Sequence, residues 1–140
     1  MIELSDEEKL FWADLLLYYE QKVKPNTTGF SIRNKELSEF IKINGIELNI
    51  KKTEEMAGLK EETRKNAFHF TCIENVCADF LRHMRNAFAH GRIEKDRKGD
   101  YKLTDKKGSV LTMIGYVESK LLMELVKKMK STRSPLFAGL

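Results

Sequence analysis

One run of apolar residues constrains the fold of this chain more than any other feature of its sequence. Between residues 59 and 90 the apolar side chains recur at steps of three and four, at Phe70, Ile73, Cys77, Phe80, Met84 and Ala87. That spacing places them on one face of an α-helix over about five turns. Gly91 follows, and glycine readily leaves a helix in a left-handed conformation. The sequence therefore predicts a long helix over residues 59–90.

A second strong helix prediction covers residues 6–24. Ser5 and Glu8 form a capping box, in which each side chain accepts from the other residue's backbone N–H. The segment 25–29, which contains proline and glycine, ends the helix. The apolar surface of this helix is wide and comprises Leu10, Phe11, Ala13, Leu15, Leu17 and Tyr18. Its width predicts burial on more than one side, partly against a second subunit.

The other elements are shorter. Leu37, Phe40 and Ile41 predict a helix over residues 34–43, and residues 46–59 predict an extended piece followed by one or two helical turns. Strand-like pieces at 92–94, 101–103 and 110–114 alternate with turns. A last helix is expected over residues 116–130, before a tail at 131–140.

Together these elements predict a mainly α fold. We expect an antiparallel bundle of four to five helices, with a small β-hairpin or meander inserted at residues 92–115, before the last helix. A chain of 140 residues fits one domain, here 1–130, followed by the C-terminal tail 131–140.

Composition narrows the classes of protein that this chain can belong to. The chain is 33% charged, with a net charge of +4, which mildly favours a polyanionic partner. It has no apolar run long enough to span a membrane, and its acidic start lacks the basic residues of a signal peptide, so we expect a cytoplasmic protein. Cys72 and Cys77 are five residues apart in the predicted helix, and we interpret them as core residues rather than a disulfide or a metal site.

The end of the long predicted helix carries the residues best suited to catalysis, Arg85, Asn86 and His90. Arginine neutralises and orients a phosphate, histidine transfers protons near neutral pH, and asparagine holds a phosphate oxygen or a ribose hydroxyl. On a regular helix Arg85 and His90 lie roughly 140° apart. Either the helix unwinds near Gly91, or a second copy of the motif completes the site in a dimer.

A structural interpretation of the same residues stays open. Arg85 and His90 also fit an ion-pair cluster at a helix end, where the helix dipole favours a histidine. His83 lies on the side of His90 and is either a second proton carrier or a surface histidine hydrogen-bonded to Asp79.

The segment from Arg85 to His90 resembles the motif of the HEPN family, an arginine and a histidine separated by four to six residues, with a polar residue after the arginine. The resemblance implies a HEPN-like helical bundle, a homodimer in which two motifs meet, and a metal-independent endoribonuclease with no cofactor. It also implies a role in toxin–antitoxin or phage-defence systems, with an antitoxin as a possible partner. Some HEPN toxins carry a tyrosine, which a partner adenylylates, where this chain has Arg92, and this disfavours that modification.

The expected reaction is attack of a ribose 2′-hydroxyl on the neighbouring phosphate, which leaves a 2′,3′-cyclic phosphate. His90 would act as general acid or base, Arg85 would stabilise the phosphate charge and Asn86 would position the scissile group. Candidate residues for substrate binding are His83, Arg82, Arg92 and Lys95. The alternatives are a HEPN-like module that binds RNA or a nucleotide without cutting it, and a dimeric adaptor.

The basic residues after the motif have two interpretations of their own. They either guide RNA towards the motif or belong to an ordinary solvated hairpin, and they are Arg92, Lys95, Arg97, Lys98, Lys102, Lys106 and Lys107.

Overall fold

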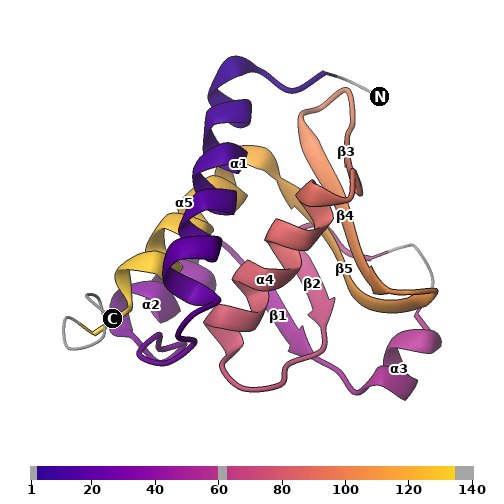
Figure 1. Ribbon diagram of the computed structural model, residues 1–140. Helices are drawn as coiled ribbons and strands as arrows, with labels where there is room; N and C mark the ends of the chain where they lie inside the picture. Colours follow the sequence, from indigo (N-terminus) through magenta and orange to yellow (C-terminus); the bar gives the residue numbers. More distant parts are fainter. Residues whose placement is uncertain (1–2, 60–62, 135–140) are drawn as a thin grey trace.

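The structure, a computed structural model, describes residues 3–59 and 63–134, and it shows that the expected mainly helical bundle is wrong. In these residues five α-helices accompany a five-stranded mixed sheet, which makes an α/β fold (Figure 1). Three strands come from the segment predicted as a small insertion, and two come from earlier residues. The β segment therefore belongs to the central sheet of the fold rather than being an addition to a bundle.

The strands lie in the order β1-β2-β5-β4-β3. Strands β1 and β2 are parallel, and the other neighbours are antiparallel. The elements in chain order are α1 (Asp6–Tyr18), the π-helical turn η1 (Tyr19–Val23), α2 (Lys35–Ile43), β1 (Glu47–Ile50), α3 (Thr53–Ala57), β2 (Ala67–Phe70), α4 (Val76–Ala89), β3 (Ile93–Lys95), β4 (Asp100–Lys107), β5 (Val110–Glu118) and α5 (Ser119–Ser131).

The predicted helix over residues 59–90 is only half helical. Asn66 has a φ of 66°, a left-handed conformation that stops any helix, and β2 follows it directly. Ile73, which was expected in the core, lies in the next loop and is 79% exposed. The helix begins only after Asn75, whose side chain accepts from the Ala78 N–H. The three-and-four spacing of Phe70 and Ile73 was thus coincidental.

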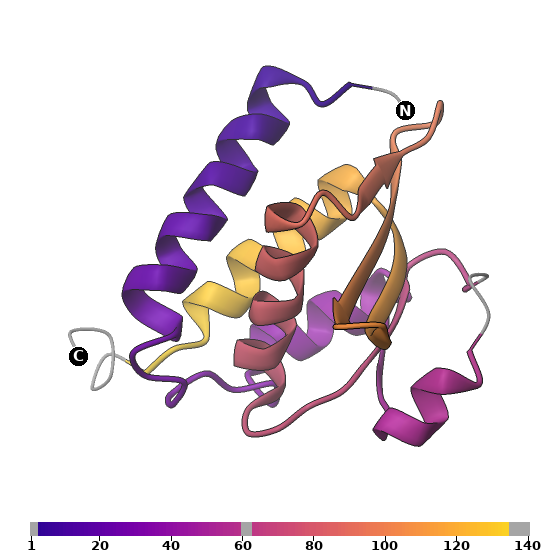
Figure 2. The same cartoon turned by 45° about the vertical axis from the view of Figure 1, so that its right-hand side comes forward.

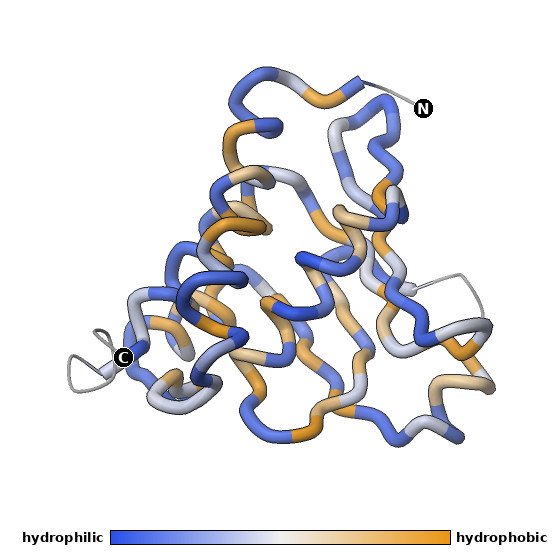
Figure 3. The backbone as a smooth tube through the Cα atoms, viewed as in Figure 1, coloured by the Kyte–Doolittle hydropathy of each residue, from blue (hydrophilic) through white to orange (hydrophobic). Residues whose placement is uncertain are grey.

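Helices α1, α2, α4 and α5 gather on one side of the sheet, and the short helix α3 lies on the other (Figures 1 and 2). The core forms between the first group and the inward residues of the central strands. There Phe68 and Phe80 meet edge to face, with ring centroids 4.9 Å apart. In Figure 3 hydrophobic and hydrophilic residues alternate along the helices and strands, as expected for elements with one buried face.

Helix α1 confirms the predicted capping box and continues into η1 up to Val23. Its Trp12 is fully buried and stacks on Phe88 of α4, with ring centroids 5.3 Å apart. Leu10 and Leu17, one heptad apart, are 67% and 56% exposed. No helix in the described parts of the chain is long and apolar enough to cross a membrane.

The C-terminal helix differs from its prediction at both ends. Residues 116–118 belong to β5, and α5 runs to Ser131 inside the expected tail. Arg133 then donates to the carbonyl oxygens of Lys22 and Asn26, at 2.6 and 2.7 Å, so this part of the chain packs against the end of η1. The rest of the expected tail, residues 135–140, lies outside the described residues.

Glu8 gives the protein a predicted pH dependence. Burial raises the pKa of this carboxyl, but hydrogen bonds from Lys95, Tyr101 and Ser5 outweigh it and lower the pKa to about 2. A lowered pKa stabilises the fold above the unfolded value of 4.5, and this contribution is lost as the pH falls towards 2. Urea unfolding should therefore show Glu8→Gln about 3 kcal/mol less stable than wild type at pH 7, with the gap closing by pH 2; a constant gap would contradict this.

Gly115 predicts a packing defect. A Cβ at this position of β5 would lie 2.4 Å from the Phe68 ring, which is fully buried. Gly115→Ala should lower the free energy of unfolding by about 1–3 kcal/mol, because the core must shift. Gly58→Ala is the matched control, since its Cβ would meet only an ordinary contact at 3.7 Å. Equal stability of the two variants in urea unfolding would refute the prediction.

Candidate functional site at the end of α4

Helix α4 stays regular up to the motif histidine. The His90 N–H donates to the Asn86 carbonyl at 3.0 Å, and Gly91 has the predicted left-handed conformation, with a φ of 66°. The Gly91 and Arg92 N–H groups then donate to the carbonyls of Phe88 and Ala87, which is a Schellman motif. The chain therefore turns only after His90, and the His90 side chain is exposed at the helix end.

Arg85 faces the π-helical turn rather than His90. Its guanidinium forms an ion pair with Glu20, at 2.9 Å between Nη2 and Oε1, and lies 5.9 Å from the centre of the Tyr19 ring. A third contact runs from Arg85 Nη1 to Asn86 Oδ1, at 3.1 Å. These contacts orient the guanidinium but leave it partly exposed. Among the described residues His90 has no side-chain hydrogen bond or ion pair. Within a single chain, therefore, no such contact connects the side chains of Arg85 and His90.

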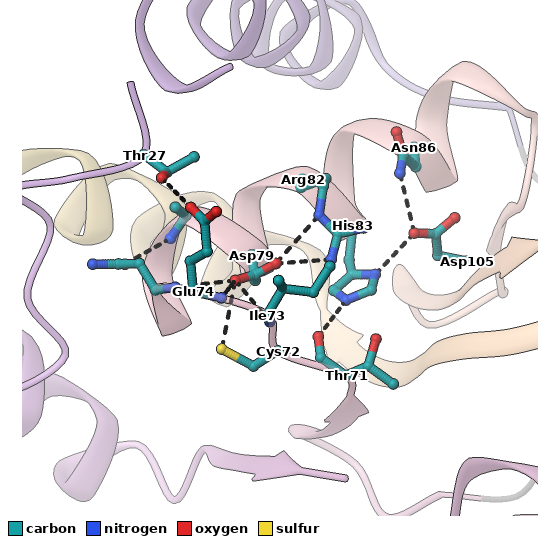
Figure 4. A network of polar contacts seen from close by, with 12 residues as sticks. Thr27, Thr71, Cys72, Ile73, Glu74, Asp79, Arg82, His83, Asn86 and Asp105 are labelled. Carbon is teal, nitrogen blue, oxygen red and sulfur yellow. Dashed lines mark hydrogen bonds and ion pairs between the residues drawn. The ribbon is translucent and has the colours of Figure 1, made fainter. Parts of the chain in front are cut away.

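Asn86 is held by a buried network (Figure 4). Its Nδ2 donates to Asp105 Oδ2 at 3.2 Å, and the same oxygen lies 2.8 Å from His83 Nδ1. His83 Nε2 lies 2.8 Å from the Thr71 carbonyl oxygen. Asn86 directly follows Arg85 in the sequence, and its side-chain amide joins Arg85 to the network, because its Oδ1 accepts from Arg85 while its Nδ2 donates to Asp105.

The charge state of the network follows from its partners. Burial raises the pKa of the Asp105 carboxyl, but hydrogen bonds from His83 and Asn86 outweigh it and hold the pKa below its usual value. The Thr71 carbonyl can only accept, so His83 Nε2 carries a proton. His83 Nδ1 and Asn86 Nδ2 both lie within hydrogen-bond distance of the same oxygen of the Asp105 carboxylate.

His83 thus differs from both predictions made for it. It is 0% exposed and bonds to Asp105 and Thr71, so it is not a surface histidine paired with Asp79. Complete burial also keeps it away from a bound substrate. His83 instead contacts the Asp105 oxygen that accepts from Asn86, and so helps to hold Asn86 in place.

Asp79 organises the start of α4 (Figure 4). One of its oxygens accepts from the N–H groups of Ile73, Glu74 and Asn75, and the other accepts from Arg82 at 2.8 Å. Burial raises the pKa of this carboxyl, but these contacts outweigh it and lower the pKa.

The two cysteines stay unbridged, and only one of them lies in a helix. Cys77 is buried in α4, as a core residue should be. Cys72 lies in the loop before α4 and donates its thiol to Asp79. Burial raises the pKa of each thiol to about 11, so both are protonated at neutral pH.

The candidate residues for substrate binding lie in three different places. Arg82 lies one turn before Asn86, and both line a groove beside α4. Arg92 lines a separate pocket of about 600 Å³ together with Lys102 and Tyr116. Lys95 is bound to Glu8 at 2.6 Å and is only 17% exposed, so it belongs to the packing of α1.

Sequence reasoning missed Asp105, which lies in a segment predicted to be a turn. Its neighbours Thr104, Lys106 and Lys107 are all polar or charged, so nothing in the local sequence distinguishes the buried carboxylate. His83 was the one available indication of a buried polar partner. It is a polar residue on a helix that packs on the sheet, and a buried histidine requires hydrogen-bond partners.

Comparison with known proteins gives one match. The sequence model of the family HEPN pEK499 p136 matches residues 14–134, which include every element from the last five residues of α1 to the end of α5. No curated protein and no solved structure matches the chain.

Proposed function

The chain belongs to the HEPN pEK499 p136 family, and from that premise we propose that it is a metal-independent endoribonuclease. The observation that carries the proposal is the end of α4. There an exposed His90 follows, one helical turn later, an Arg85–Asn86 pair that is held in place by Glu20 and Asp105. The proposed biological role is that of a toxin or phage-defence effector, controlled by an antitoxin protein.

The chemistry follows from the side chains. The 2′-hydroxyl of one nucleotide attacks its own 3′-phosphate, a new P–O2′ bond forms, and the bond to the 5′-oxygen of the next nucleotide breaks. His90 takes the proton of the 2′-hydroxyl or gives a proton to the leaving 5′-oxygen, water completes the other transfer, and Arg85 neutralises the charge that accumulates on the phosphate. The products are a 2′,3′-cyclic phosphate and a 5′-hydroxyl.

A dimer is part of the proposal. Arg85 and His90 point in directions roughly 140° apart on the regular helix, and no unwinding before Gly91 brings them together. Two copies of the motif across a two-fold axis would supply both residues to one phosphate. The exposed Leu10 and Leu17 on α1 give an apolar stripe that a second copy could cover.

This assembly predicts a solution mass near twice the 16.3 kDa of one chain. Light scattering at micromolar concentration is the measurement, with Leu10→Ser, Leu17→Ser as the variant expected to shift the protein towards the monomer. A monomeric mass for the wild type would contradict the paired site.

Cleavage of RNA in excess chelator tests the proposed activity. We expect the purified wild type to cut single-stranded RNA and to leave the same sequence uncut when the ribose at each cleavage position lacks its 2′-hydroxyl. Binding of RNA without any cleavage would favour the non-catalytic module, and neither binding nor cleavage would favour the dimeric adaptor; both results would refute the proposal.

A further inference from the structure

A basic groove lies beside α4, on the side of Asn86. It has a volume of about 890 Å³ and opens between the segment after β1, the segment after β2, α4 and the end of β4. Four lysines from two distant parts of the sequence line it, Lys51, Lys52, Lys106 and Lys107. We call it the lysine groove. In Figure 1 the turn between β4 and β5 lies close to α3, which brings the two lysine pairs to the same end of the molecule.

The charges of the lysine groove are unbalanced. None of its four lysines makes an ion pair with a described carboxylate, whereas Arg82 of the same groove is paired with Asp79. The acidic residues that line it are partly engaged, since Asp105 is buried in the His83 network and Glu55 accepts from the Lys52 backbone N–H. The lining still carries five basic side chains against the three carboxylates of Glu54, Glu55 and Asp105, so its formal net charge is positive and the groove attracts anions.

The structure also separates basic residues that are close in sequence. Arg97 and Lys98 precede β4, while Lys106 and Lys107 end it, so the two pairs lie at opposite ends of an eight-residue strand. A strand of that length spans about 25 Å. The basic segment after the motif therefore does not form one continuous surface. Only Lys106 and Lys107 from it line the groove that also contains Lys51, Lys52 and Asn86 of α4.

We propose that the lysine groove holds the sugar–phosphate backbone of single-stranded RNA and leads it past Asn86 to His90. This inference rests on the proposed function and names the path of its substrate. His90 lies four residues beyond Asn86, about 6 Å further along α4. The residues lining the groove include no aromatic ring on which a base can stack. The groove therefore binds phosphates rather than bases, and its affinity is independent of sequence and falls with salt.

Fluorescence anisotropy with a labelled 2′-O-methyl RNA tests the path, because this probe lacks the nucleophile and cannot be cut by the proposed reaction. The variant is Lys106→Ala, Lys107→Ala. The control is Arg97→Ala, Lys98→Ala, which removes the same charge at the other end of β4. All four side chains are exposed, and thermal unfolding followed by circular dichroism checks that both variants fold.

The groove variant should bind at least about tenfold more weakly, and the slope of log affinity against log salt should fall by about 1.4, or 0.7 for each lost phosphate contact. The control should keep the wild-type slope. Equal losses in both variants, or no loss in the groove variant, would overturn the inference. The binding assay stands apart from cleavage, so a protein that binds in the groove but never cuts RNA would refute only the proposed activity.

Discussion

Replacing His90 with alanine is expected to slow RNA cleavage about 10²–10⁴-fold, the usual contribution of one general acid or base. The fold should not change, because His90 is exposed and its side chain makes no hydrogen bond or ion pair among the described residues. Initial rates on a fluorogenic RNA, with thermal unfolding of the same preparations, separate the two effects. A variant that keeps its rate within a few-fold of wild type would remove His90 from the mechanism.

Arg85 gives the matching test, because its two roles can be told apart. Arg85→Ala removes both the proposed phosphate contact and the Glu20 ion pair, whereas Glu20→Gln removes only the ion pair. A half-exposed ion pair contributes at most about 1 kcal/mol to stability. The rate should therefore fall strongly in Arg85→Ala and only modestly in Glu20→Gln. Equal rates in the two variants would mean that the ion pair, and not the phosphate contact, is what matters.

The second large effect is expected at Asp105, a buried residue whose contacts are to His83 and Asn86. Asp105→Ala leaves the buried His83 without a partner for Nδ1 and frees the Asn86 amide. Leaving a buried hydrogen-bonding group without its partner costs about 1–3 kcal/mol for each group. Urea unfolding should show this loss at pH 7, a large part of the stability of a typical domain. A loss below about 1 kcal/mol would show that the network does not stabilise the fold.

A gentler substitution keeps this prediction testable if Asp105→Ala fails to fold. Asp105→Asn retains an oxygen that can accept from His83 or Asn86, so it should be less destabilising than alanine. Asp96→Asn, in the turn before β4, is the control for the loss of one negative charge. If Asp105 positions Asn86, cleavage by Asp105→Asn should also slow at saturating RNA concentration, whereas its affinity for 2′-O-methyl RNA should not fall, because the substitution removes a negative charge from the groove lining.

The sequence predicted local features of the fold better than its class. The capping box at Ser5 and Glu8, the end of the second helix at residue 43 and the left-handed Gly91 are each encoded within a few residues, and all three are present. The sheet is not local, because β2 pairs with β1 on one side and with β5, more than forty residues later, on the other. Four residues such as 67–70 are too short for periodicity to separate a strand from a helix.

The candidate site also divides into residues that are local in the sequence, which were predicted, and residues from distant segments, which were not. Arg85, Asn86 and His90 were found because they are adjacent on one helix and carry recognisable chemistry. Asp105 and Lys51 were missed because they reach α4 only through the sheet, from segments with no distinctive pattern. The angle between Arg85 and His90 was predictable from helix geometry alone, and the regular hydrogen bond from His90 to Asn86 agrees with it.

The end groups of the RNA products test the central claim most directly. Mass spectrometry of fragments made by the wild type in excess chelator should show 2′,3′-cyclic phosphates and 5′-hydroxyls, and these should be absent with His90→Ala. Fragments with 5′-phosphates, or no fragments from a folded wild type, would contradict an RNA-cleaving site built on Arg85, Asn86 and His90.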